Sequence, residues 1–551
     1  MNNLEIMPLG GVGEFGMNCM MLRFGEDVII IDAGMGFPEE ADFGVDICIP
    51  NFEILEEYRE NIRALILTHA HEDHIGATAF FLKKFNVPVY ASRLTIAFIE
   101  EKLLEFERFE CTLIEVEPCE IVREGNFEIE FIHASHSLVE CYSVAVKTPV
   151  GTVFHTGDYK IDDSPVIGEP YDLQSLKRLG KEGILAVFGD STNATVQGRT
   201  PSEQEVIPDL RKIFDETEGR LFVTTFSSSF HRIQILLDLT YETGRKICAL
   251  GRSLRKNVDL GIELGLLDAP PGVLLDLNDI RRLPHEQVVY LATGSQGEMR
   301  SAMWGIATQS YKGIQIYKGD TVVISSRTIP GNEKRIAKMI SAVYRAGGTV
   351  IEDRSRQIHV SGHGAREDIR ILLEALKPRF LVPIHGEFRM LCSHKEFAVD
   401  ELGFSDENVF LIEDGDILTF DQTSARKTGK KEVSRVLISN DGMRELEEEA
   451  LRVRKKIAST GLVLVNIKIS EHSRILLEEP KIRCFGLNPS QTTEEFLEQT
   501  KGKLVDKFQS LEPADFRIIA NVEETIRIFL KRAFSRTIGA KPYIIVEISE
   551  K

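Results

Sequence analysis

Four side chains that can bind a metal ion lie within six residues, directly after a short apolar strand predicted over 63–67. The segment reads Thr68-His69-Ala70-His71-Glu72-Asp73-His74. His69 and His71 alternate along an extended turn, and Asp73 and His74 follow where a helix begins. Zinc accepts imidazole and carboxylate ligands, and two such pairs at one strand end can serve two adjacent cations. We interpret the segment as a metal site; the alternative is a histidine-rich surface loop.

The rest of the chain predicts an α/β protein in which one domain is inserted into another. Short apolar strands separated by turns are expected over 19–24, 28–31, 127–132, 143–147 and 152–154. From 202 to 348 helices and strands alternate as in a parallel sheet, and the first pattern then resumes at 380–384. The segment 422–432 is polar, basic and non-periodic, which is typical of a linker. We therefore expect a first domain in two parts, 1–200 and 351–421, an inserted domain, 201–350, a linker, 422–433, and a tail domain, 434–551.

The tail is expected to be a small α+β domain that contains two amphipathic helices. Apolar residues recur on one face of each helix at the helical spacing. These faces either promote self-association or cover the sheet of their own domain. They consist of Leu497, Leu504, Phe508 and Leu511 in the first helix, and Val522, Ile526, Phe529 and Leu530 in the second.

Composition narrows the class of protein. The 551 residues exceed what one core supports, and no apolar run approaches the ~20 residues of a membrane span. Residues 1–5 show no basic or apolar signal region, and the eight cysteines form no C-x-x-C pair, so we expect a reduced, cytoplasmic protein with no membrane partner. A net charge of −19 argues against coating nucleic acid by bulk electrostatics, but not against holding RNA in a local groove.

A glycine-rich segment near the start imitates a dinucleotide-binding motif. Residues 11–16, Gly-Val-Gly-Glu-Phe-Gly, satisfy G-x-G-x-x-G. That motif works where a helix N-terminus follows it to hold the pyrophosphate. Residues 17–24 predict a strand instead, so we expect a tight turn at the mouth of the active site.

The metal-binding segment and three later motifs resemble the metallo-β-lactamase superfamily. His-x-His-x-Asp-His after a strand is its signature, and Asp32-Ala33-Gly34, Ser135-His136-Ser137 and His155-Thr156-Gly157-Asp158 resemble its other motifs. The resemblance implies that Asp32 orients the metal-binding loop, that His136 completes the first metal site and that Asp158 bridges two metals.

Further motifs resemble the nucleic-acid-processing β-CASP members, most closely the ribonuclease J family. They are Asp190-Ser191-Thr192-Asn193-Ala194, the run from Thr225 to Arg232, Thr293 to Glu298, Ile329 to Glu333, His359-Val360-Ser361-Gly362-His363 and Pro383-Ile384-His385-Gly386-Glu387. The implied fold is an α/β metallo-β-lactamase αββα sandwich with an inserted β-CASP α/β domain and a small C-terminal α+β domain. The implied activity is zinc-dependent hydrolysis of RNA, both 5′→3′ exonucleolytic and endonucleolytic.

The resemblance also supplies an expected set of site residues. We predict two Zn²⁺ per chain, with Mn²⁺ or Mg²⁺ as possible substitutes, held by His69, His71, His136 and Asp158 and by Asp73, His74, Asp158 and His385. Asp158 is the expected bridge because a carboxylate has two oxygens to share. Asp190 is expected to orient a histidine, and His363 or Asp73 to act as the general acid. The expected phosphate pocket consists of Ser227, Ser228, Ser229, His231, His359, Val360, Ser361, Gly362 and His363.

Two other classes of function stay open at this point. A metallo-β-lactamase fold can hydrolyse another ester, a lactam or a thioester, but such small substrates need no inserted domain. A non-catalytic RNA-binding scaffold would not require the complete set of ligands. The expected substrate is therefore single-stranded RNA, preferably 5′-monophosphorylated, cleaved by a homodimer or homotetramer.

Overall fold

The computed structural model describes residues 3–38, 44–106, 110–329, 331–352, 355–439, 446–470, 472–473, 475–488, 493–512, 515–539 and 541–550. The chain divides into two compact units, which are described separately. The first contains residues 1–36 and 49–435, and the second contains residues 37–48 and 436–551.

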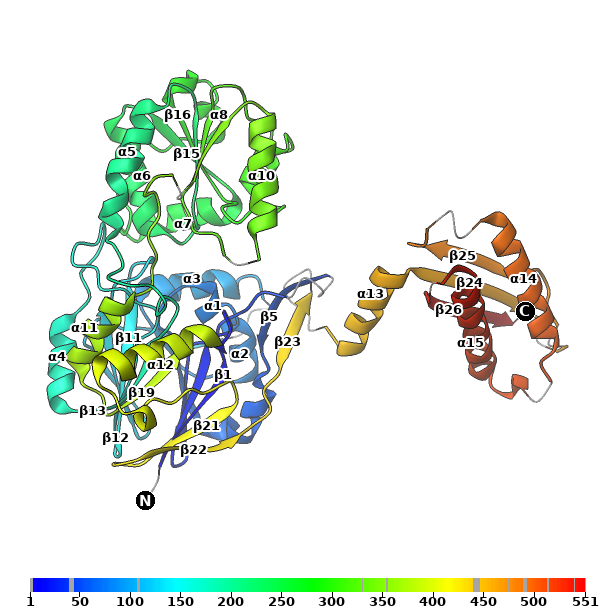
Figure 1. Cartoon of the computed structure of the whole chain (residues 1–551), viewed down its shortest axis with the longest axis horizontal. Helices are drawn as coiled ribbons and strands as arrows, with labels where there is room; N and C mark the ends of the chain where they lie inside the picture. The colour runs from blue at the N-terminus through cyan, green and yellow to red at the C-terminus, as the bar shows by residue number, and fades with distance from the viewer. Residues whose placement is uncertain are drawn as a thin grey trace. The chain divides into compact units, whose positions relative to one another are not determined.

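Two mixed sheets packed face to face form the first domain (Figure 1). The eight-stranded sheet has the order β22-β21-β1-β3-β4-β6-β7-β8, and the six-stranded sheet has the order β19-β13-β12-β11-β10-β9. Side chains from both sheets, such as Ile29, Phe131 and Phe188, form one buried core. The strands are β1 (Leu4–Gly10), β3 (Cys19–Phe24), β4 (Asp27–Ile31), β6 (Ile62–Ile66), β7 (Val89–Ala91), β8 (Leu113–Glu115), β9 (Ile121–Glu124), β10 (Phe127–Ala134), β11 (Cys141–Thr148), β12 (Gly151–His155), β13 (Ile184–Asp190), β19 (Phe380–Ile384), β21 (Asp416–Phe420) and β22 (Ala425–Lys430).

Helices cover the outer faces of the two sheets and complete four layers, αββα (Figure 1). On the six-stranded side α12 packs on β19, and α4 packs closely on α11. A Cβ at Gly180 of α4 would lie 2.1 Å from the carbonyl oxygen of Ala375, so this approach requires glycine. The helices of the first domain are α1 (Glu72–Ile75), α2 (Thr78–Lys84), α3 (Arg93–Leu103), α4 (Leu173–Glu182), α11 (Arg366–Leu376) and α12 (Phe388–Leu402).

A second α/β domain is inserted between β13 and β19, which are themselves parallel neighbours in one sheet. Its five-stranded sheet is parallel throughout, with the order β15-β16-β14-β17-β18. The inner strands β16, β14 and β17 are buried between helices, as a parallel sheet requires. The elements are β14 (Leu221–Thr224), β15 (Lys246–Leu250), β16 (Val288–Ala292), β17 (Thr321–Ile324), β18 (Thr349–Glu352), α5 (Ile207–Glu216), α6 (Phe230–Glu242), α7 (Arg252–Glu263), α8 (Leu277–Ile280), α9 (Ala302–Ala307) and α10 (Glu333–Arg345).

The prediction of a linker over 422–433 was wrong. Residues Ala425–Lys430 form β22, which pairs antiparallel with β21 at the edge of the eight-stranded sheet. Lys427 forms an ion pair with the buried carboxylate of Asp416. An edge strand exposed to water needs no apolar alternation, so its polar sequence looks like a linker.

The tail folds as an α+β domain, as predicted. Its strand β24 (Leu462–Ile469) lies between β25 (Lys481–Phe485) and β26 (Tyr543–Glu550), and its helices are α13 (Glu448–Thr460), α14 (Glu494–Gln509) and α15 (Ile519–Ile538). The apolar faces of α14 and α15 pack on this sheet. Leu504, Phe508, Val522, Ile526 and Leu530 are buried in one core, and Leu497, Leu511 and Phe529 pack against it. These faces therefore form the domain's own interior and are not a surface for self-association.

In the part of the chain that the structure describes, no helix combines the length and the hydropathy needed to cross a bilayer.

Candidate metal centre

The strand ends of the first domain bring the predicted metal-binding segment into a fixed conformation. Asp32 follows β4 with a φ of 63°, and its carboxylate accepts hydrogen bonds from the backbone N–H and the hydroxyl of Thr68, at 2.8 and 2.9 Å. The same carboxylate lies 2.7 Å from His74 Nδ1. A Cβ at Gly34 would lie 1.6 Å from the carbonyl oxygen of Asp73, so only glycine at position 34 allows the metal-binding loop to pack this closely. Through these contacts to Thr68 and His74, the Asp32-Ala33-Gly34 motif orients the metal-binding segment 68–74.

The first of two clusters consists of His69, His71, His136 and Asp158, whose potential ligand atoms lie within 4.8 Å of one another. Oδ2 of Asp158 is 3.7 Å from His69 Nε2 and 3.8 Å from His136 Nε2. Burial lowers the pKa of His69 and of His136 well below the usual value, so these imidazoles are neutral. A neutral imidazole has the free lone pair that coordination requires.

The second cluster consists of Asp73, His74, Asp158 and His385, again within 4.8 Å. The other oxygen of Asp158, Oδ1, is 3.3 Å from His74 Nε2 and 3.4 Å from His385 Nε2. His385 Nε2 also lies 3.7 Å from Asp73 Oδ2. One carboxylate therefore turns a different oxygen toward each cluster, which is the arrangement that a bridging ligand needs.

Both clusters suit metal ions. Oδ1 of Asp158 and Nε2 of His385 are buried and have no hydrogen-bond partner among the described residues. Buried polar atoms without partners are costly, and a cation between them would satisfy these two. The structure thus brings together all seven predicted ligands, and their nitrogen and oxygen donors are those that zinc accepts.

Asp190 and His363 form a pair beside the clusters. Asp190 ends β13, and its Oδ2 lies 2.8 Å from His363 Nδ1. Burial alone would lower the pKa of His363, but the charges of Asp190 and Asp158 raise it to about 9. The side chain of His363 is 20% exposed. The histidine that Asp190 orients is His363.

The loop 359–363 lies directly against the first cluster. The carbonyl oxygen of Gly362 is 2.7 Å from His136 Nδ1, and a Cβ at Gly362 would lie 2.5 Å from the His136 ring. Ser361 accepts a hydrogen bond from the backbone N–H of His363. Val360 is buried, and burial lowers the pKa of His359 to about 3.

The segment of three serines lies at the start of α6. Ser229 is the residue before the helix, and Ser227 and Ser228 are half-buried. His231, which is predicted to belong to the phosphate pocket, is buried, and burial lowers its pKa to about 4, so its imidazole is neutral. Its Nδ1 accepts a hydrogen bond from the backbone N–H of Ile167. In the described part of the chain, no hydrogen bond or ion pair joins these four residues to the two clusters.

A buried arginine links the serine segment to the loop 359–363, and the sequence analysis missed it. Arg232 is 1% exposed and donates to the carbonyl oxygen of Ile358 at 2.5 Å, to Ser325, and to Glu203 at 2.7 Å. Its position directly after His231 was the available signal, but the sequence does not show that the guanidinium points inward.

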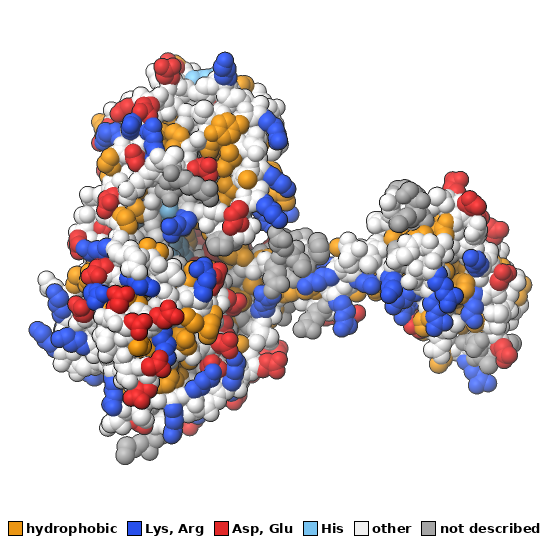
Figure 2. All heavy atoms as spheres, viewed as in Figure 1, with side chains coloured by type: hydrophobic (Ala, Val, Ile, Leu, Met, Phe, Trp, Pro, Cys, Tyr) orange, Lys and Arg blue, Asp and Glu red, His pale blue; other side chains and the backbone are white. Residues whose placement is uncertain are grey.

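A strand, β3, and not a helix follows the glycine-rich segment 11–16, as predicted. This segment lies between β1 and β3 and contains the short strand β2 (Val12–Gly13), which pairs with β20 (Gly386–Glu387) directly after His385. The ring of Phe15 lies edge-on to His385, with 6.4 Å between the centroids. Histidine side chains are visible in the recess between the inserted and the first domains (Figure 2).

Four descriptions of known protein families match successive segments of the chain. The metallo-beta-lactamase superfamily matches residues 12–194, the ribonuclease J beta-CASP domain 218–343, the Zn-dependent metallo-hydrolase RNA specificity domain 350–411, and the ribonuclease J C-terminal domain 449–551. Ribonuclease J of Synechocystis sp. is 36% identical over 98% of this chain and 86% of its own length. The chain belongs to the ribonuclease J family.

Other family members are similarly close. Ribonuclease J of Helicobacter pylori is 34% identical over 98% of this chain and 79% of its own length. Ribonuclease J of Thermus thermophilus is 33% identical over 99% of this chain and 95% of its own length. Among solved structures, a protein of unknown function from Enterococcus faecalis V583 superposes with a TM-score of 0.53, at 13% identity, over 76% of this chain and 100% of its own. That likeness concerns the fold alone. Members of this family are metal-dependent ribonucleases. Membership therefore argues against hydrolysis of a lactam or a thioester as the function.

Proposed function

We propose that the chain cleaves RNA with two zinc ions, one in each cluster, and that Mn²⁺ or Mg²⁺ can replace them. The observation that carries the proposal is the placement of Asp158, with one oxygen toward His69 and His136 and the other toward His74 and His385. If bound by these residues, two cations would supply a polarised water and positive charge beside the scissile phosphate. The RNA-specificity domain and the family support RNA as the substrate.

His363 is the group that we propose as the proton donor to the leaving oxygen. Its Nδ1 is turned toward Asp190, which leaves Nε2 for the substrate. An imidazole can donate a proton near neutral pH, and the side chain of His363 is 20% exposed. Asp73, whose side chain is 30% exposed, is the competing candidate. Asp190 acts through His363 and is a positioning residue.

The phosphate pocket is proposed to receive the 5′-monophosphate during 5′→3′ exonucleolysis. Hydroxyl groups of Ser227 and Ser228 and backbone N–H groups of the loop 359–363 can bind a phosphate without selecting a base. The neutral His231 and His359 contribute hydrogen bonds and no positive charge. A 5′-triphosphate is larger and more highly charged than such a pocket accommodates. Internal cleavage would leave the pocket without a terminal phosphate.

The metal assignment is tested with Asp158→Ala in the full chain. Bound zinc, measured by elemental analysis, should fall, and cleavage of a labelled RNA should be lost. Asp163→Ala is the matched control, because the Asp163 side chain is 64% exposed and pairs with Arg199. Two zinc ions per chain and undiminished turnover in Asp158→Ala would refute the assignment.

The phosphate pocket is tested separately with Ser228→Phe. Cleavage of 5′-monophosphorylated RNA should fall more than internal cleavage of a 5′-hydroxyl form of the same RNA. Equal losses would mean that Ser228 serves the scissile phosphate instead.

We further propose that the enzyme acts in the cytoplasm as a homodimer or homotetramer. None of the eight cysteines forms a disulfide bond in the structure, which supports a reducing compartment. The interior faces of α14 and α15 are not available for assembly, so another surface would be needed. Sedimentation of the full chain, compared with a chain that ends before Val436, measures the contribution of the tail.

A further inference from the structure

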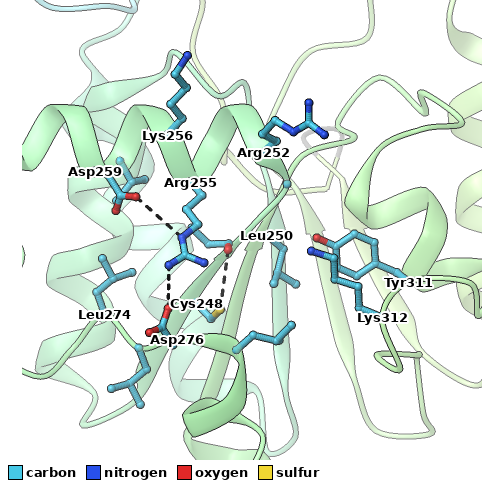
Figure 3. Close-up of a pocket in the computed structure, with 15 residues that line it drawn as sticks. Cys248, Leu250, Arg252, Arg255, Lys256, Asp259, Leu274, Asp276, Tyr311 and Lys312 are labelled. Carbon is cyan, nitrogen blue, oxygen red and sulfur yellow. Dashed lines mark hydrogen bonds and ion pairs between the residues drawn. The ribbon is translucent and has the colours of Figure 1, made fainter. Parts of the chain in front are cut away.

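The inserted domain contains a cavity of about 610 Å³ that is separate from the metal clusters (Figure 3). It lies at the carboxyl end of β15 and is lined by the first turns of α7, by the segment 274–277 and by Tyr311 and Lys312. Cavities of this size hold small organic ligands, and open parallel sheets bind ligands at the carboxyl ends of their strands.

Four cationic side chains line the cavity. Arg255 lies between Asp276, at 2.8 Å, and Asp259, at 3.9 Å, and Lys256 pairs with Glu101 of α3. Figure 3 shows Arg255 between the two carboxylates, with Tyr311 and Lys312 on the opposite wall.

The other two cations, Arg252 and Lys312, take part in none of the ion pairs formed by the described residues. The Lys312 ammonium lies 5.7 Å from the centre of the Tyr311 ring. The cavity therefore keeps two positive charges for an anionic group.

The start of α7 adds hydrogen-bond donors on the same side. The helix begins after Gly251, which has a φ of 108°, and no side chain caps it. The backbone N–H groups of the first turn are the positive end of the helix and favour an anion. The remaining wall is apolar: burial raises the pKa of Cys248 to about 11, so its thiol is neutral, and its neighbours are Leu250, Leu274, Leu275 and Leu277.

We propose that this cavity binds a nucleoside 5′-monophosphate group. Its phosphate contacts Arg252, Lys312 and the start of α7, and its base packs on Tyr311 and the leucines. A free nucleotide and one nucleotide of an RNA strand offer the same chemistry. The cavity is distinct from the proposed 5′-phosphate pocket, although α7 connects the two, because Asn257 Nδ2 donates to the carbonyl oxygen of Ser227 at 2.9 Å.

Hydrogen exchange read by mass spectrometry locates the binding site in the full chain without requiring turnover. The probes are adenosine 5′-monophosphate, adenosine, and a short 2′-O-methyl oligoribonucleotide that resists cleavage. Binding should protect segments 249–258 and 309–314, and the phosphate should make AMP bind more tightly than adenosine. Protection of segment 225–231 reports the proposed 5′-phosphate pocket separately, so failure of one proposal is distinguishable from failure of the other.

In the double variant Arg252→Glu/Lys312→Glu, both charged contacts are lost. The apparent affinity, read from the protection of segments 249–258 and 309–314, should therefore fall roughly tenfold or more. Arg282→Glu/Lys212→Glu is the matched control, with the same change of charge on side chains that are 77% and 61% exposed. Protection by AMP identifies a free nucleotide as a ligand, and protection by the oligoribonucleotide alone identifies an RNA strand. If neither probe protects these segments, or if both double variants lose protection equally, the proposal is overturned.

Discussion

Breaking the buried ion pair between Arg232 and Glu203 on one side should cause a large, measurable loss of stability in the inserted domain. Arg232 and Glu203 are 1% and 2% exposed, and their atoms are 2.7 Å apart. Burial alone would raise the pKa of Glu203, but the positive charges of Arg232 and Lys160 lower it, so the carboxylate is ionised. Because Arg232 also donates to Ile358, it ties α6 to the segment that precedes the loop 359–363.

Arg232→Met removes the guanidinium and leaves the carboxylate of Glu203 buried without its partner. Breaking a buried pair on one side costs about 3–5 kcal/mol. The methionine side chain fills most of the volume, so the cavity adds little, and Lys160 still offsets part of the charge. We expect Arg232→Met to lower the free energy of unfolding by about 3 kcal/mol. Adding Glu203→Gln removes the stranded charge and should restore about 2 kcal/mol of it.

The assay is urea denaturation followed by tryptophan fluorescence. Trp304 is the single tryptophan of the chain and packs against the core of the inserted domain, so its signal reports the unfolding of that domain. Arg282→Met, on an exposed side chain, is the control and should change stability by less than about 0.5 kcal/mol. A loss below about 1 kcal/mol in Arg232→Met, or no recovery in the double variant, would refute the reasoning.

Three further predictions concern other parts of the chain. Burial and the charge of Glu14 raise the pKa of Asp414 to about 8, so the folded state holds a proton that the unfolded state, with a pKa of 3.8, releases. Stability should therefore fall as pH rises from about 4 to about 8, and Asp414→Asn should flatten this part of a plot of melting temperature against pH; an unchanged slope would contradict the shift. His363→Gln should lower turnover at saturating RNA without reducing bound zinc, and lost metal would show a structural role instead. Leu530→Ala, at a fully buried position of α15, should lower the free energy of unfolding of the tail by about 2–5 kcal/mol in chemical denaturation. A change near zero would mean that this face of α15 does not form part of the core.

Local patterns in the sequence account for much of the metal centre. His69, His71, Asp73 and His74 are close in the chain and follow one strand, so the backbone alone brings them together. His136, Asp158 and His385 were predicted from motifs that resemble a known family, and the structure brings them to the same place. The inserted α/β domain was predictable as well, because alternating helices and apolar strands leave few alternatives to a parallel sheet.

Other features depend on side-chain direction and on neighbours that are distant in the chain. The His363–Asp190 contact joins residues 173 positions apart, and only the fold shows that it raises the pKa of His363 to about 9. His231 is neutral because burial lowers its pKa to about 4, and the sequence alone does not show that burial.

The sequence by itself determined that residues 69–74 can bind metal and where helices and strands alternate, because both depend on chemistry and periodicity along the chain. The other three ligands were predicted only from the resemblance to a known family. Tertiary structure decided which surfaces are covered. The polar segment 425–430 became an edge strand because β21 offered it a partner, and the apolar faces of α14 and α15 became a core because the tail sheet lies beneath them. Burial is a property of the neighbours that a residue meets, and those neighbours are set only when the chain folds.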